Sequence, residues 1–166
     1  MIDRNTMLKA EKGDKESQYE LCLYYVKEGI FNFAFFWAQK SAKQGFAPAM
    51  FKLGEFYRMG IGTKINLKLA HKWLKKATKK RNIDATNWLI GDYLVGIFKT
   101  SNRKMLSLCK KSSKKDSKVG EYYLGLCYFK GIGVRKNVKK AKEHFTKSAS
   151  NGFEFAKMQL SDKTFA

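Results

Sequence analysis

Apolar residues recur at steps of three and four along most of the chain, which is the period of an amphipathic helix. The clearest example lies between Ala49 and Ala85, where two such patterns flank the turn Gly60-Ile61-Gly62. The apolar face comprises Ala49, Leu53, Phe56, Tyr57 and Gly60 in the first pattern and Leu67, Ala70, Trp73, Leu74 and Ala77 in the second. Lysines fill much of the opposite face of the second pattern. This stretch is therefore predicted to form a helical hairpin with one apolar side.

The hairpin pattern repeats along the chain. A small residue opens each first helix, at spacings of 32, 36, 35 and 36 residues: Ser17, Ala49, Ala85, Gly120 and Ala156. A leucine follows four residues after every opener: Leu21, Leu53, Leu89, Leu124 and Leu160. A tyrosine follows eight residues after the first four: Tyr25, Tyr57, Tyr93 and Tyr128. One hairpin cannot bury its own apolar stripe, so we expect the copies to stack on one another.

The repeat predicts where the helices lie. First helices are expected near 16–28, 48–59, 84–95 and 119–130, and second helices near 31–44, 64–81, 99–118 and 135–150. The four repeats then span about 17–48, 49–84, 85–119 and 120–155. Residues 1–16 and 156–166 are predicted to cap the ends, because a terminal repeat has one side without a neighbour. At 166 residues, we expect a single domain over 1–166.

The repeat resembles a known family. The pattern A-x3-LG-x2-Y-x2-G-x-G-V-x-[DN]-x2-KA-x2-[HW]-[FYL]-x-K-[AS] is similar to the Sel-one-like repeat, a relative of the tetratricopeptide repeat. Residues 120–155 match it best and 49–85 almost as well, whereas 17–48 lacks the GxG turn. Residues 85–119 are degenerate, with Met105, Leu106, Leu108 and Cys109 where alanine and tryptophan are usual. The resemblance implies an all-α fold, a right-handed α-solenoid of about four helix-turn-helix repeats with partial capping helices.

The net charge of +20 is distributed unevenly. The predicted second helices carry 24 Lys and Arg against 2 acidic residues, and the first helices carry 4 against 7. In solenoids that this chain resembles, first helices line the concave surface and second helices form the convex back. The resemblance thus implies an aromatic, mildly acidic inner surface and a basic outer one. Such a charge can attract nucleic acid, an acidic protein or an anionic membrane surface, or it can simply keep the surface solvated.

The basic outer surface has a composition that argues against sequence-specific nucleic-acid recognition. That function favours arginine and interleaved aromatic residues, whereas most basic residues here are lysine and the second-helix aromatics fall mainly at core repeat positions. Non-specific attraction of phosphate stays open as an alternative. The residues proposed for this convex face are Lys72, Lys75, Lys76, Lys79, Lys110, Lys111, Lys114 and Lys115.

A different set of residues is predicted to contact a protein partner. These are first-helix positions that the repeat does not use for packing, and they are rich in residue types common at interface hot spots. The predicted concave face comprises Tyr24, Phe51, Lys52, Glu55, Arg58, Asn87, Trp88, Asp92, Tyr122 and Tyr123, and the same reasoning adds Gln18, Glu20, Leu21, Cys22, Leu23, Thr86, Glu121 and Phe129. Trp88 and Tyr24 are its strongest candidates.

The cysteines and histidines give no sign of catalysis. Cys22, Cys109 and Cys127 occupy non-equivalent repeat positions, whereas disulfide-bearing members of the resembled family pair cysteines within each repeat; we expect buried free thiols. His144 stands at a repeat position of tryptophan and is expected to pack, and His71 has no Asp or Cys at metal spacing. We therefore expect no catalytic residue, no metal and no cofactor.

The sequence also leads to expectations about the location and function of the protein. The chain has no run of eighteen apolar residues and no apolar leader at its N-terminus, which predicts a cytoplasmic protein without a membrane-inserted segment. We expect a non-enzymatic scaffold that binds an acidic protein through its concave face, as a monomer or in a 1:1 complex. One hypothesis is an immunity protein that neutralises an antibacterial toxin. The alternatives are a basic nucleic-acid-binding protein and a regulatory or host-interaction adaptor.

Overall fold

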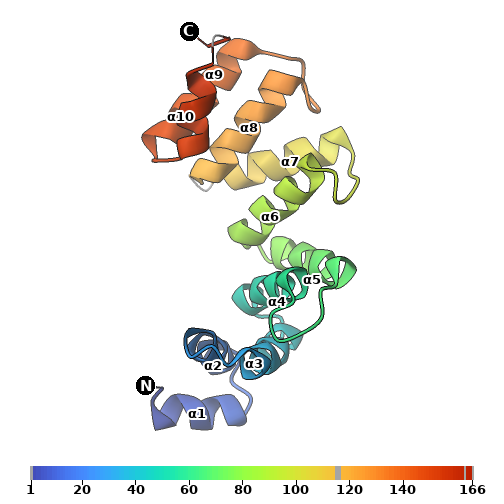
Figure 1. The fold of residues 1–166 in the computed structure, drawn as a ribbon. Helices are drawn as coiled ribbons and strands as arrows, with labels where there is room; N and C mark the ends of the chain where they lie inside the picture. The colour runs from blue at the N-terminus through green and yellow to red at the C-terminus, as the bar shows by residue number, and fades with distance from the viewer. Residues whose placement is uncertain (1, 115–116, 163, 166) are drawn as a thin grey trace. The chain divides into compact units, whose positions relative to one another are not determined.

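The computed structural model describes residues 2–114, 117–162 and 164–165. Over these residues the fold is all-helical, as the sequence predicts (Figure 1). In chain order the helices are α1 (Arg4–Glu11), α2 (Lys15–Lys27), α3 (Phe31–Lys43), α4 (Ala47–Met59), α5 (Leu67–Lys79), α6 (Ile83–Leu94), α7 (Asn102–Ser113), α8 (Lys118–Lys130), α9 (Val138–Ser150) and α10 (Glu154–Leu160). They divide into two compact units, Met1–Ala85 and Thr86–Ala166, which are described separately. The single domain over 1–166 stays a prediction.

The first helices of the four hairpins begin and end within one residue of their predicted bounds. Three of the four second helices begin about three residues later than predicted, because polar side chains cap them there. The carboxamide of Asn66 accepts a hydrogen bond from the Leu69 N–H at 3.0 Å, and that of Asn137 accepts one from Lys140 at 2.9 Å. Ser101 caps α7 in the same way. Each cap satisfies a backbone donor that the first helical turn leaves without a partner.

Two glycines in the GxG turn have separate roles. Gly60 takes φ 73° and ends α4 in the left-handed conformation that glycine adopts at little cost. Gly62, at φ 65°, lies so close to α3 that a Cβ atom there would meet the carbonyl of Phe31. Gly133 lies against Asn102 in the same way in the second unit. The GxG motif therefore both ends a first helix and docks the turn onto the preceding hairpin.

In the first unit, α2 packs against α1 and α3, and α4 packs against α3 and α5 (Figure 1). The buried side of α3 consists of small residues, among them Ala34, Ala38 and Ala42, which allow its backbone to come close to its neighbours. Phe56 of α4 is buried together with Cys22 of α2 and the α3 alanines. The core of this unit is thus shared between consecutive helices.

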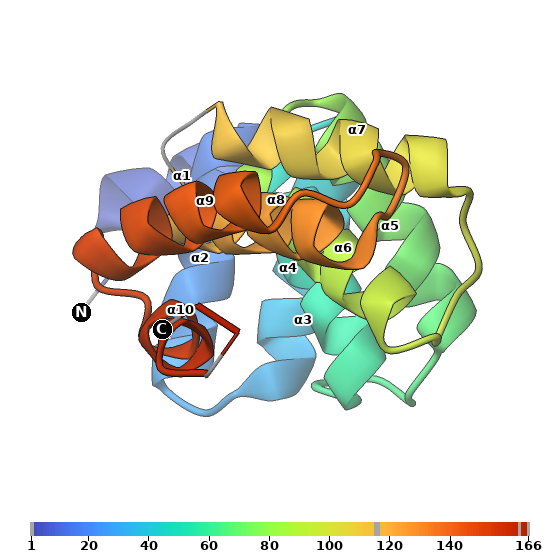
Figure 2. The ribbon, with the colours of Figure 1, turned by 90° about the horizontal axis from the view of Figure 1, so that it is seen from above.

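In the second unit, α8 packs against both α7 and α9, and α10 packs against α9 (Figures 1 and 2). Ile90 of α6 joins Met105 and Cys109 of α7 and Leu124 of α8 in one buried cluster. Beyond α10, Phe165 is buried and its ring packs edge-on against Phe145 at 5.4 Å between ring centroids. The end of the described chain therefore covers apolar surface of α8 and α9.

One position on each first helix sets how closely the second helix can approach. It lies five residues after the opener and is occupied by Cys22, Gly54, Ile90 and Gly125. A Cβ added to Gly54 would lie 2.9 Å from the Leu74 side chain, and one added to Gly125 would lie 2.6 Å from Phe145.

In the other two hairpins, the larger residue of this pair lies on the first helix and the smaller one on the second helix. Cys22 is buried in a cluster with Ala38, and Ile90 is buried in a cluster with Cys109; Ala38 and Cys109 hold the repeat positions of Leu74 and Phe145. The small residue has thus moved to the second helix. Because a close-packed interior tolerates little change in volume, this exchange keeps each hairpin filled.

A buried serine joins the two helices of the first and fourth hairpins. The Ser41 hydroxyl donates a hydrogen bond to the Lys15 carbonyl at 2.7 Å, and the Ser148 hydroxyl donates to the Lys118 carbonyl at 2.6 Å. Ser112, at the same repeat position, donates to the side-chain oxygen of Asn87 instead. These bonds connect the second helix to the start of the first, where the backbone lies close enough for a short side chain to reach.

We predict that Gly125→Ala lowers the free energy of unfolding by about 1–3 kcal/mol, because the new methyl group overlaps the ring of Phe145. Gly91→Ala is the matched control: its Cβ would meet only the Tyr123 hydroxyl at 3.4 Å, so we expect no loss and a gain of up to about 1 kcal/mol from helix propensity. Urea denaturation measures both. Equal effects of the two substitutions would contradict the close approach at Gly125.

Candidate functional site

The predicted partner-contacting residues of the first unit lie mainly on α4. Phe51, Glu55 and Arg58 are spaced by four and three residues, so they form one stripe along the helix, and all are partly exposed. The Lys52 ammonium pairs with the Glu55 carboxylate at 2.7 Å. The stripe therefore combines an aromatic ring, a fixed ion pair and an arginine on one rigid helix.

Tyr24 lies on α2 and is also partly exposed. Its ring packs edge-on against Tyr25 at 5.3 Å between ring centroids. The neighbouring Leu23 is exposed and holds the repeat position that Glu55 occupies on α4. The α2 part of this unit thus offers aromatic and aliphatic surface where α4 offers charge.

In the second unit, two of the predicted residues hold the same repeat position on different helices. Trp88 of α6 and Tyr123 of α8 lie three residues after their openers, as Lys52 does in the first unit, and all three are partly exposed. One repeat position therefore leaves a large side chain partly exposed in three of the hairpins, although Tyr123 also packs against both hydrophobic clusters of the second unit.

Two other predicted residues of the second unit take part in packing. Asn87 accepts a hydrogen bond from Ser112 at 2.5 Å and donates one to Ser117 at 3.3 Å. Tyr122 packs against the rings of Phe145 and Phe153, at 5.6 and 5.2 Å between centroids. Both side chains are partly exposed, but their contacts connect neighbouring helices and leave less of them for a partner.

Asp92 is a correction to the predicted face, because the structure buries it. It lies seven residues after its opener, where two other hairpins place Phe56 and Cys127, both buried as well, and the first hairpin places Tyr24, which is partly exposed. That position therefore points inward in three of the four hairpins. Phe56 and Cys127 already indicated a packing position in the alignment of the repeats.

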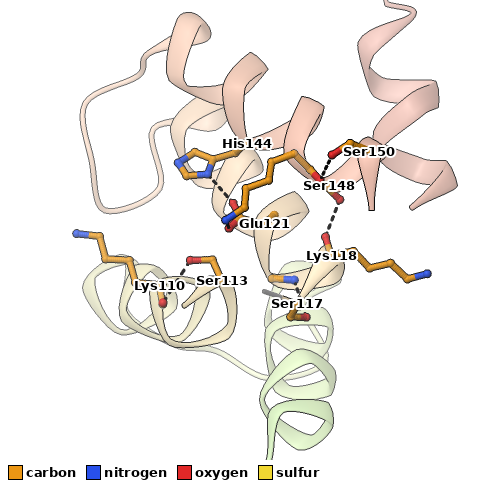
Figure 3. A network of polar contacts seen from close by, with 10 residues as sticks. Lys110, Ser113, Ser117, Lys118, Glu121, His144, Ser148 and Ser150 are labelled. Carbon is orange, nitrogen blue, oxygen red and sulfur yellow. Dashed lines mark hydrogen bonds and ion pairs between the residues drawn. The ribbon is translucent and has the colours of Figure 1, made fainter. Parts of the chain in front are cut away.

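Glu121 and Gln18 are also buried rather than exposed, as are Thr86, Leu21 and Cys22. Figure 3 shows Glu121 of α8 beside His144 of α9, and its carboxylate lies 2.8 Å from Nδ1 of His144. The same carboxylate lies 2.9 Å from Nζ of Lys147, which is also on α9. The His144 ring stacks on Tyr128, at 5.4 Å and an interplanar angle of 7°. His144 therefore packs as expected and in addition pairs with a buried carboxylate. Gln18 donates to the Ala10 carbonyl at 3.0 Å and so connects α2 to α1.

All three cysteines are buried, as the sequence predicts. Burial raises the pKa of the Cys22 thiol to about 12, so this thiol stays protonated at neutral pH. In the second unit the sulfur atoms of Cys109 and Cys127 lie 3.5 Å apart, and their hydrogen bond together with burial raises the pKa of Cys109. Cys127 thus contacts Cys109 while His144 contacts Glu121, and these contacts do not assemble a nucleophile with a base.

The basic residues of the predicted convex face are exposed on α5 in the first unit and on α7 in the second. The exposed members are Lys72, Lys75, Lys76, Lys79, Lys110, Lys111 and Lys114, whereas Lys115 lies outside the described residues. Nζ of Lys76 lies 4.1 Å from the centre of the Trp73 ring. On α7, a hollow of about 410 Å³ is lined by Arg103, Leu106, Ser107, Lys110, Lys111 and Lys114.

Helix α3 carries an aromatic surface that was not predicted from the sequence. The second-helix aromatics were expected mainly in the core, which is wrong for Phe33 and Phe36, because their exposed fractions are 54% and 46%. The small residues of α3 face inward, so the two phenylalanines fall on the outer side of the helix. The repeat indicated that these positions are exposed, because Lys140 of α9 holds the position of Phe33 and Lys72 of α5 holds the position of Phe36.

No helix among the described residues is long and apolar enough to cross a lipid bilayer.

Repeated helical hairpins with a shared small-residue opener and a GxG turn define an α-solenoid of helix-turn-helix repeats. The Sel1 repeat model matches residues 15–46, 47–82 and 119–153, which is more than half of the chain. The chain therefore belongs to the Sel1 repeat family. Residues 83–118 lie outside these matches, and they contain the hairpin whose sequence is degenerate.

Curated relatives share the repeat at modest identity. The Sel1-repeat-containing protein YjcO of Escherichia coli K12 is 28% identical over 151 residues, which cover 85% of this chain and 63% of that protein. Chitin synthase regulatory factor 3 of Schizosaccharomyces pombe is 28% identical over 132 residues, 77% of this chain and 14% of that protein. The chain thus spans less than two thirds of the length of these relatives.

Solved structures support the fold over nearly the whole chain. The crystal structure of c5321, a protective antigen of uropathogenic Escherichia coli with an SLR fold, has a TM-score of 0.84 at 25% identity, covering 93% of this chain and 34% of that one. A Sel1 repeat protein from Oxalobacter formigenes has a TM-score of 0.81 at 24% identity, covering 93% and 46%. The α-solenoid fold predicted from the sequence is confirmed.

We predict that Glu121→Gln lowers the free energy of unfolding by about 1–2 kcal/mol, because it removes the charge from a buried carboxylate that binds His144 and Lys147. Glu143→Gln on the exposed side of α9 is the control, and we expect a change within about 0.5 kcal/mol. Thermal or urea unfolding at neutral pH measures both. A Glu121→Gln protein as stable as the control would show that the network contributes nothing to the packing of α8 on α9.

Proposed function

We propose that this protein is a non-enzymatic scaffold that binds a partner protein through exposed side chains of its first helices. Sel1 repeat proteins generally serve as scaffolds for protein–protein interaction. The observation that carries the proposal is the repeat position shared by Lys52, Trp88 and Tyr123, which leaves a large side chain partly exposed in three hairpins. Aromatic and arginine side chains on rigid helices lose little conformational freedom when they bind, which favours them as anchors.

The favoured partner is an acidic protein in the cytoplasm, bound in a 1:1 complex. A net charge of +20 accelerates encounter with a negatively charged surface, while the first-helix side chains supply the specific contacts. In its most specific form the proposal is an immunity protein that neutralises an acidic antibacterial toxin. A regulatory or host-interaction adaptor would use the same surface.

A second candidate function is non-specific binding of nucleic acid. The hollow on α7 favours it, because Arg103, Lys110, Lys111 and Lys114 surround one surface with positive charge. Lysine ammonium groups attract backbone phosphates without reading bases, so such binding would depend steeply on salt.

We predict that a protein partner captured by the purified chain survives nuclease treatment and a change from about 0.15 M to about 0.5 M salt, because its contacts are short-ranged and partly buried. The double variant Arg58→Ala/Trp88→Ala is expected to weaken the complex at least about tenfold, as loss of hot-spot residues does. Titration calorimetry with the captured partner measures the affinity. Circular dichroism confirms that the variant is folded.

The matched control is the triple variant Lys110→Glu/Lys111→Glu/Lys114→Glu, which leaves the first helices unchanged. We expect it to retain the partner within a few fold at about 0.5 M salt, where long-range attraction is screened. If the triple variant loses binding while Arg58→Ala/Trp88→Ala retains it, or if nuclease releases the captured material, the basic surface is the binding site and the scaffold proposal fails.

A further inference from the structure

The outer side of α3 carries a row of exposed apolar residues. Ile30, Phe33 and Phe36 follow one another at steps of three, and 44%, 54% and 46% of these residues is exposed. Phe33 and Phe36 are spaced by three residues and lie on one side of the helix, and Ile30 precedes the helix as its N-cap residue. These three exposed residues are here called the α3 ridge. Exposed apolar residues scattered singly need no explanation, but a contiguous row of them marks a surface for interaction.

The aromatic side chains of the ridge are held by neighbouring rings. Phe33 stacks on Tyr25 of α2, at 5.2 Å between centroids and an interplanar angle of 29°. Phe36 packs edge-on against Trp37 at 5.2 Å. The helix itself is fixed from its inner side by buried Ala34 and Ala38. Each phenylalanine therefore presents a fixed apolar surface, so that little conformational freedom is lost when the ridge is covered.

The charges around the ridge are positive. Nζ of Lys40 lies 4.6 Å from the centre of the Phe36 ring and 4.9 Å from that of Trp37. Lys43 and Lys27 are exposed at the ends of α3 and α2. Helix α3 contains no acidic residue, and the acidic residue nearest to the ridge in sequence is Glu28. Helix α5 of the same unit also contains no acidic residue and exposes its lysines to solvent.

This combination decides between two kinds of occupant. Protein interfaces are depleted in lysine, and their rims usually combine both signs of charge. The surface of an anionic bilayer suits the ridge better, because phenylalanine can enter the boundary between headgroups and acyl chains while lysines extend to the lipid phosphates. We propose that the α3 ridge binds an anionic lipid bilayer, with Phe33 and Phe36 entering that boundary and Lys40 and Lys43 contacting headgroups.

The proposed contact is peripheral and lies on a second helix of the first unit, whereas the residues proposed to bind a protein lie on first helices. It needs no spanning segment, since only two side chains enter the lipid. It also accounts for a feature that the matching positions lack, because Phe33 corresponds to Leu69 of α5 and Lys140 of α9, and Phe36 corresponds to Lys72 and Glu143. Neither α5 nor α9 carries an aromatic residue at either position.

The test is co-sedimentation of the purified chain with phosphatidylcholine vesicles, with and without about 30% phosphatidylserine, at about 0.1 M salt. The wild-type chain is expected to bind the anionic vesicles. The variant Phe33→Ser/Phe36→Ser is expected to bind them at least about tenfold more weakly, because it loses the apolar insertion. The variant Phe33→Leu/Phe36→Leu keeps the apolar surface and is expected to bind within about threefold of the wild type.

The matched control is Phe155→Ser/Met158→Ser on α10, where 62% and 68% of the two residues is exposed. It removes a comparable apolar pair in the other unit, and we expect its vesicle binding to equal that of the wild type. Urea denaturation shows that each variant is folded. Equal binding by the wild type and Phe33→Ser/Phe36→Ser would mean that the chain is attracted to the vesicles by charge alone. If the wild type does not bind anionic vesicles, a lipid bilayer is excluded as the occupant of the ridge. Either result overturns the proposal.

Discussion

The close approach of the two helices within each hairpin is the constraint on which the rest of the structure depends. The hairpins meet it in two ways. Gly54 and Gly125 leave room on the first helix for Leu74 and Phe145, whereas Ile90 and Cys22 fill the room that Cys109 and Ala38 leave on the second. The larger residue of the pair can thus lie on either helix, provided that its partner is small, as expected for a close-packed interior. This explains how the degenerate third hairpin keeps its place in the fold although the family model does not match it.

Internal packing also determines which side chains stay partly exposed. Where the opener and the residue five places later point inward, the residue three places after the opener is left partly exposed, as in Trp88 and Tyr123. The same logic applies to α3, whose buried residues are alanine and serine and whose Phe33 and Phe36 face outward. The two proposed surfaces, the first-helix side chains and the α3 ridge, are thus consequences of how the hairpins close.

The repeat spacing was sufficient to predict the fold, because each hairpin carries the same opener, leucine, tyrosine and glycine at fixed positions. It was less informative about exposure. Asp92 and Glu121 were predicted to contact a partner because the repeat motif does not use their positions for packing, yet both are buried. Glu121 is stabilised there by His144 and Lys147, which a sequence pattern does not place nearby. Helices α5 and α9 begin later than the apolar pattern predicts, because asparagine side chains cap them at those points.

An exchange of sizes in the third hairpin tests most directly whether volume is shared across each pair of helices. Ile90→Ala alone should lower the free energy of unfolding by about 2–4 kcal/mol, and Cys109→Leu alone by about 1–3 kcal/mol, through a cavity and an overlap respectively. In the double variant the leucine fills the space left by the isoleucine, so the combined loss should be smaller than the sum by at least about 1 kcal/mol. Urea denaturation of the four proteins gives this coupling. Losses that simply add would show that the two positions do not share one space, and would contradict the account.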